Sequence, residues 1–148
     1  MHKMAMEIIL IEDNPADVEL TLRALRKNKI LNKVIVLSDG EEALDFLFMR
    51  GKFETRSDVH PKLILLDLKL PKINGLEVLK AIKSNEKFKW IPVVILTSSR
   101  QESDLIKSYN LGANSYIVKP VDFEQFVDAI RELGLYWLLM NEIPKNEL

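Results

Sequence analysis

Residues 63–75, with the sequence LILLDLKLPKING, give the clearest indication of how this chain folds. Four apolar residues run without interruption into Asp67, a pattern typical of a strand that is buried on both faces of a parallel sheet. Pro71 cannot continue the hydrogen-bonded ladder of a strand, so the chain is expected to turn after Asp67. Open α/β sheets bind ligands outside the carboxyl ends of their strands, and Asp67 therefore lies where a reactive side chain is expected.

Apolar runs of the same kind recur along the chain and alternate with helical patterns. Strands are predicted over residues 7–11, 34–37, 62–67, 91–96 and 115–118. Helices are predicted to follow the capping residues Asn14, Asp39, Asn74 and Asp122, and a further helix is predicted over residues 102–111. This alternation predicts an α/β fold, namely a doubly wound, five-stranded parallel sheet with five helices on its two faces. The polar residues 51–61 lack a period and are predicted to form a loop.

Composition limits the classes of protein to consider. The chain has 148 residues, 47% of them apolar and 29% charged, which is typical of one soluble globular domain. Its 21 basic and 22 acidic residues lack the basic excess of a nucleic-acid-binding surface. The absence of cysteine excludes disulfides, zinc thiolates and thiol nucleophiles. No leader or membrane span is recognisable, so we expect a cytoplasmic protein with one domain over residues 1–148, its core at 6–138 and a short tail at 139–148.

Five polar residues follow the carboxyl ends of four predicted strands: Glu12, Asp13, Asp67, Thr97 and Lys119. Carboxylates gathered at one edge repel one another, by about 1–4 kcal/mol for a pair about 4 Å apart. A Mg²⁺ ion, which binds carboxylate and phosphate oxygens, would relieve this repulsion. An aspartate beside a metal, a lysine and a hydroxyl suits phosphoryl transfer. Each residue alone would indicate only a helix cap or a surface turn, so the prediction rests on their combination.

Four segments in a fixed order carry a resemblance to a known family. They are ILIEDNP (residues 9–15), LILLDLKLPKING (63–75), PVVILTSS (92–99) and LGANSYIVKP (111–120). Together they resemble the receiver domain of response regulators, and the likeness extends from about residue 6 to residue 136. The long loop at 51–61 and the sequence KPVDFEQF (119–126) resemble the small stand-alone receivers paired with phytochrome-type sensor kinases. The resemblance implies a flavodoxin-like fold with the strand order 2-1-3-4-5.

The resemblance also implies a role for each residue of the edge. Asp67 would be the phosphoacceptor of a two-component phosphorelay. Mg²⁺ would be held by Glu12, Asp13, Asp67 and the backbone carbonyl of Lys69. Thr97 and Lys119 would contact the phosphoryl group. Tyr116 would be the switch aromatic that responds to Thr97, Ser98 would leave room for the phosphoryl group, and the Lys119–Pro120 peptide would be cis. The protein would catalyse only its own phosphorylation and dephosphorylation, and would not be a turnover enzyme.

The implied partners are proteins. A sensor histidine kinase, of the phytochrome type, or a histidine phosphotransfer protein would donate the phosphoryl group, and no effector domain is expected after Leu148. On the last predicted helix, an inward face is expected from Phe123, Phe126, Val127, Ile130, Leu133 and Trp137. Leu135 and Leu139 would point almost opposite, toward solvent. We therefore expect a homodimer through the segments from Ser103 to Leu111, Ser115 to Val118 and Asp122 to Leu139, with a frayed helix end and a folded-back tail as the alternative explanation.

Three other functions are less well supported by the residues. A haloacid-dehalogenase-type phosphatase needs a second acid two residues after its nucleophile, but Pro15 and Lys69 occupy these positions after Asp13 and Asp67. A nucleotide-binding fold would need a glycine-rich loop after the first strand, and none is present. A degenerate receiver that signals without phosphorylation would have no need for the complete set of acids, threonine and lysine.

Overall fold

The computed structural model describes residues 7–27, 33–56, 61–98 and 107–135. Its sheet contains β1 (Glu7–Ile11), β2 (Lys33–Leu37), β3 (Pro61–Asp67), β4 (Val93–Thr97) and β5 (Ser115–Val118). All neighbouring strands pair in parallel, in the order β2-β1-β3-β4-β5. The predicted doubly wound sheet and its strand order are therefore confirmed. Strand β1 follows the predicted bounds, whereas β4 begins at Val93 because Ile91 belongs to a turn that bonds back to Phe88.

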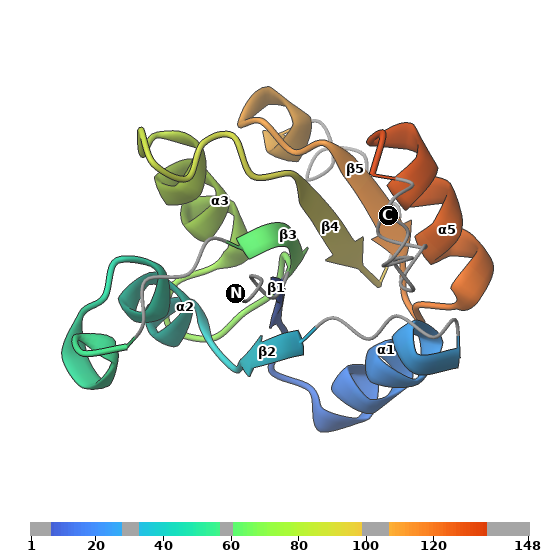
Figure 1. Cartoon of the computed structure of the whole chain (residues 1–148), viewed down its shortest axis with the longest axis horizontal. Coiled ribbons are helices and arrows are strands. Elements are labelled where there is room, and N and C mark those ends of the chain that lie inside the picture. Colours follow the sequence, from blue (N-terminus) through green and yellow to red (C-terminus); the bar gives the residue numbers. More distant parts are fainter. Residues whose placement is uncertain (1–6, 28–32, 57–60, 99–106, 136–148) are drawn as a thin grey trace, which may run out of the picture.

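Helices cover both faces of the sheet (Figure 1). They are α1 (Pro15–Lys27), α2 (Gly40–Leu47), α3 (Gly75–Lys83) and α5 (Phe123–Glu132), with a short 3-10 helix η1 (Gly51–Phe53). Helices α1 and α5 lie on one face, and α2 and α3 lie on the other. Of the helix predicted over residues 102–111, residues 107–110 are helical and the preceding ones lie outside the described residues. Gly112 follows with φ of 106°, the left-handed conformation that ends a helix.

Side chains on the strands divide between two apolar clusters. Residues of β1, β3 and β4 alternate in direction, so that Ile9 and Ile64 pack toward α2 and α3 while Leu10 and Leu65 pack toward α1 and α5. All four side chains are fully buried. The continuous apolar runs of the sequence are explained by this burial on both faces.

The four predicted capping residues each precede a described helix. The side chains of Asp39, Asn74 and Asp122 each accept a hydrogen bond from the backbone N–H three residues later. The segment predicted as an unstructured loop at 51–61 includes η1, and the guanidinium of Arg56 donates to the carbonyl of Phe46 at the end of α2. The described part of this loop, residues 51–56, is therefore anchored to the helix before it.

The end of the last helix differs from the prediction. Helix α5 ends at Glu132, and Gly134 has φ of 72°. The N–H of Gly134 bonds to the carbonyl of Arg131, and that of Leu135 bonds to the carbonyl of Ile130, which is the Schellman arrangement for ending a helix. A face extrapolated at 100° per residue is therefore wrong beyond Leu133.

This early ending changes the expected apolar surface. Leu135 packs against the cluster between the sheet and α1 and α5, although it was predicted to face solvent. Phe123 is exposed, although it was predicted to face inward, because it is the first residue of α5 and lies at the edge of the buried face. Trp137 and Leu139 lie outside the described residues.

Candidate functional site

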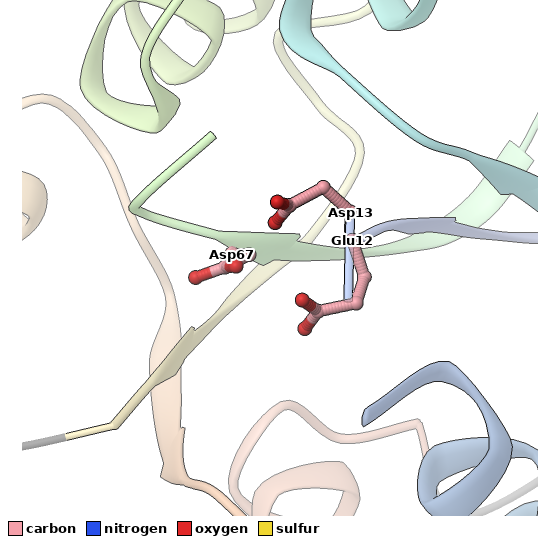
Figure 2. A group of neighbouring side chains, drawn as sticks. All are labelled: Glu12, Asp13 and Asp67. Carbon is pink, nitrogen blue, oxygen red and sulfur yellow. The ribbon is translucent and has the colours of Figure 1, made fainter. Parts of the chain in front are cut away.

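Three carboxylates meet at the carboxyl edge of the sheet. Glu12 and Asp13 follow β1, and Asp67 is the last residue of the neighbouring strand β3. One oxygen from each side chain lies within 4.8 Å of the others. Figure 2 shows Glu12 and Asp13 leaving the end of β1 in different directions, with Asp67 beside them. Glu12 and Asp67 are buried and Asp13 is exposed, so the cluster is open to solvent from one side.

Strand alternation explains which way these acids face. Glu12 continues the series of Ile8 and Leu10, and Asp67 continues that of Leu63 and Leu65, all of which face α1 and α5. The two buried acids are thereby directed toward the layer of helices on that side. The backbone N–H of the second residue after Asp67 donates to its Oδ1 at 3.1 Å, which fixes the orientation of this carboxylate.

Lys119 joins the cluster from the end of β5. Its Nζ lies 3.1 Å from Oε1 of Glu12, 3.3 Å from Oδ2 of Asp67 and 3.0 Å from Oδ2 of Asp17. The lysine side chain is 11% exposed. Its backbone N–H donates to the carbonyl of Thr97 at 2.7 Å, so two predicted site residues are joined through the main chain. The structure thus places a largely buried ammonium group among three acids.

Asp17 is a member of the site that sequence reasoning missed. It lies in the first turn of α1, where an acid is expected simply to favour the positive end of the helix. The side chain of Asn14 accepts hydrogen bonds from the backbone N–H groups of Ala16 and Asp17, at 2.9 and 3.0 Å. This cap fixes the first turn over the sheet edge. The place of Asp17 in the site could have been inferred from the sequence. The connection between Glu12 and the helix is short, so the helix must start above the same edge of the sheet.

Burial and charge alter the proton affinity of two groups. Burial, assisted by the nearby charge of Asp67, raises the pKa of Glu12 to about 7. Burial acts to lower the pKa of Lys119, but the hydrogen bond to Asp17 and the charges of Asp67 and Glu12 outweigh it and raise that pKa well above its ordinary value. Lys119 is therefore a permanent cation near neutral pH, while Glu12 can exchange its proton there.

The predicted switch aromatic, Tyr116, lies on the opposite face of the sheet. Thr97 is the last residue of β4 and follows Leu96, the strand partner of Asp67. Tyr116 packs against the cluster between the sheet and α2 and α3, from the adjacent strand β5. The ring of Tyr116 lies edge-on to that of Tyr109, with 6.3 Å between the centroids. Ser98 is exposed at the end of β4. The Lys119–Pro120 peptide is cis, as the resemblance implies.

The donor set fits a hard divalent cation. All three acids of the cluster offer oxygen, and Mg²⁺ prefers oxygen ligands and binds through one or more carboxylates while keeping several waters. Lys69 follows Asp67 by two residues, and its backbone N–H donates to Oδ1 of Asp67. The described structure thus brings together the three acids that were predicted to bind the metal.

The sequence matches a known protein family over most of its length. The sequence model of one protein family, the response regulator receiver domain, matches residues 8–131. The chain belongs to the response regulator receiver domain family. None of the described helices of this receiver is long and apolar enough to cross a membrane.

Several stand-alone receivers are similar over nearly the whole chain. The bacteriophytochrome response regulator RtBRR is 55% identical, with a TM-score of 0.86, over 95% of this chain and 85% of that one. The response regulator Rcp1 of Synechocystis is 40% identical over 93% of this chain and 92% of its own, and its Mn²⁺-bound form has been solved (TM-score 0.75). The phosphorylated cyanobacterial phytochrome response regulator RcpA is 39% identical, with a TM-score of 0.76, over 95% and 99% of the two chains.

Proposed function

We propose that this receiver accepts a phosphoryl group on Asp67 from a sensor histidine kinase, with Mg²⁺ held by Glu12, Asp13, Asp67 and the carbonyl of Lys69. The observation that carries the proposal is the meeting of three carboxylates within 4.8 Å beside the ammonium of Lys119. The Mn²⁺-bound form of Rcp1 and the phosphorylated form of RcpA support it by similarity. When bound, the metal would neutralise charge on the transferring phosphoryl group.

The chain's own residues have separate tasks in the transfer. An oxygen of Asp67 attacks the phosphorus atom, and a new P–O bond forms as the bond from phosphorus to the donor breaks. The backbone N–H of Lys69 holds the Asp67 carboxylate in place. Lys119 donates to the phosphoryl oxygens and stabilises their charge. The hydroxyl of Thr97 then bonds to the same group, and its movement would allow Tyr116 to turn inward.

The proposal predicts a covalent product on one residue. After incubation with acetyl phosphate and Mg²⁺, the intact protein should gain the mass of one phosphoryl group, with release of acetate. The Asp67→Asn variant should gain none, because its amide is a poor nucleophile, while Asp128→Asn, an exposed position on α5, should react like the wild type. No gain of mass from acetyl phosphate or from a kinase would contradict the proposal, and steady turnover of phosphomonoesters would favour a phosphatase.

Binding of Mg²⁺ should depend on pH through Glu12. Its pKa of about 7 means that the metal competes with a proton for this carboxylate near neutrality. The apparent affinity should therefore rise with pH and be about tenfold weaker at pH 6 than at pH 8. Calorimetric titrations of Mg²⁺ at both pH values measure this difference, and Glu12→Gln should bind weakly at both. Equal wild-type affinities at pH 6 and 8 would contradict the assignment of Glu12.

The partner and cellular location follow from the same proposal. The kinase would be of the phytochrome type, which is supported by the similarity to RtBRR, and a histidine phosphotransfer protein is the other donor of this chemistry. The receiver would act in the cytoplasm and would signal through protein contacts. It would promote only its own phosphorylation and dephosphorylation, so it would not be a turnover enzyme.

We also propose a homodimer through residues 107–111, β5 and α5. Strand β5 lies at the edge of the sheet, and a groove of about 270 Å³ runs between β5, α5 and Tyr109. Tyr109, which lines this groove, is 44% exposed, and Phe123 at the start of α5 is 39% exposed. Sedimentation velocity over a range of concentrations, with and without a phosphoryl mimic, tests the assembly. A monomer under every condition would overturn it.

A further inference from the structure

The ammonium of Lys119 donates one hydrogen bond to Asp17, a carboxylate that is not part of the proposed metal site. A lysine has three N–H donors. In this structure Nζ donates to Glu12 at 3.1 Å, to Asp67 at 3.3 Å and to Asp17 at 3.0 Å. The contact with Asp17 is the shortest of the three. Glu12 and Asp67 belong to the cluster that fits a metal, whereas Asp17 lies outside it.

A phosphoryl group on Asp67 would offer new acceptors to the N–H donors of Lys119. It adds a charge of about −1.5 to −2 and three acceptor oxygens, by analogy with other phosphorylated side chains. Lys119 can turn more than one donor toward those oxygens only by leaving Glu12 or Asp17. The side chain of Glu12 is 0% exposed, whereas that of Asp17 is 26% exposed. Leaving Asp17 costs less, because water can replace the lost hydrogen bond there.

We propose that Asp17 is a positioning residue that retains Lys119 in its unphosphorylated arrangement and competes with the phosphoryl group for it. This inference rests on the proposed phosphorylation of Asp67. Asp17 is held in place for this task, because the cap made by Asn14 fixes its backbone. Its negative charge also lies beside the position of an incoming anion, so competition for Lys119 and charge repulsion act in the same direction.

The proposal predicts that a substitution of Asp17 has opposite effects on the binding affinities for an anion and for a cation. In Asp17→Asn, the apparent affinity for fluoroberyllate, measured at saturating Mg²⁺, should rise about three- to tenfold. This range lies between the strength of an exposed ion pair and that of a hydrogen bond to a buried charged group. The affinity for Mg²⁺ alone should instead fall by about two- to fivefold, because a negative charge is lost and Lys119 turns further toward Glu12 and Asp67.

The experiment is a pair of calorimetric titrations, with Mg²⁺ alone and with fluoroberyllate in Mg²⁺, on the full chain. Glu19→Gln is the matched control, since it removes the same charge from α1, and among the described residues Glu19 pairs only with exposed arginines. It should leave both affinities within about twofold of the wild type. A structural role of Asp17 as a first-turn acid would change the stability of α1 and would not move the two affinities in opposite directions.

A second measurement needs no variant. In the wild-type protein, the side-chain carboxyl ¹³C resonance of Asp17 should move toward that of a hydrated carboxylate when fluoroberyllate binds. Unchanged or weaker fluoroberyllate binding by Asp17→Asn, with normal binding by the wild type, would overturn this inference and leave the proposed function intact. Failure of the wild type to bind fluoroberyllate and to gain a phosphoryl group would overturn both.

Discussion

Replacing Lys119 by methionine should lower the free energy of unfolding of the metal-free protein by about 2–4 kcal/mol. The side chain is 11% exposed, and its ammonium group lies 3.0–3.3 Å from oxygens of three acids. Two of these acids, Glu12 and Asp67, are buried, so without Lys119 they must either repel each other where solvent screens the charges weakly or take up a proton at Glu12. Methionine has a similar length, and the loss is therefore one of charge rather than of packing.

The same variant should respond to metal in a distinctive way. Mg²⁺ should restore most of the lost stability, because its charge replaces that of the missing lysine beside the carboxylates. Its binding also stabilises the folded state. Fluoroberyllate affinity should nevertheless fall by at least about tenfold, since the metal cannot replace a directed donor. Urea unfolding in chelator and in Mg²⁺ measures the first effect, with the exposed Lys80→Met on α3 as control. An equal loss of stability in both buffers would indicate a packing defect and contradict this account.

The sheet was predictable because its strands are buried on both faces. Strand β3 then has an unbroken apolar run from Leu63 to Leu66, and its end at Asp67 is visible in the sequence. The positions of the residues that follow such strands can therefore be predicted equally well. The gathering of Glu12, Asp13 and Asp67 follows from parallel strands alone, without any knowledge of side-chain geometry.

Features that depend on the approach of a second element were not predictable in the same way. Asp17 contacts Lys119 because α1 starts above the strand edge. In the sequence, an acid at this position is already explained by its favourable interaction with the helix dipole, so its residue type alone does not indicate a role in the site. The end of α5 was missed because apolar periodicity continues past Gly134, whose positive φ breaks the helix. Periodicity predicts a face only while the helix continues.

Gly75, the last residue of the stretch LILLDLKLPKING, should tolerate no side chain. Its φ is not positive, so the constraint is one of space. A Cβ placed on it would meet the carbonyl oxygen of Asp67 and would lie 2.5 Å from Cα of Leu68, both of them backbone atoms. The N–H of Gly75 also donates to the carbonyl of Leu68 at 2.9 Å. The start of α3 is therefore packed directly against the chain that carries the phosphoacceptor.

The Gly75→Ala variant should lose about 2–4 kcal/mol of stability, because backbone on both sides must move to admit a methyl group. The displacement includes Asp67, so phosphorylation by acetyl phosphate should slow by at least about tenfold in the protein that remains folded. Gly134→Ala is the matched control: its φ of 72° makes alanine strained, but nothing lies within 4 Å of a Cβ there. That variant should lose about 1–2 kcal/mol and retain the wild-type phosphorylation rate. If Gly75→Ala lost stability but kept the rate, the close approach would serve packing alone, and the position of Asp67 would depend on its strand rather than on α3.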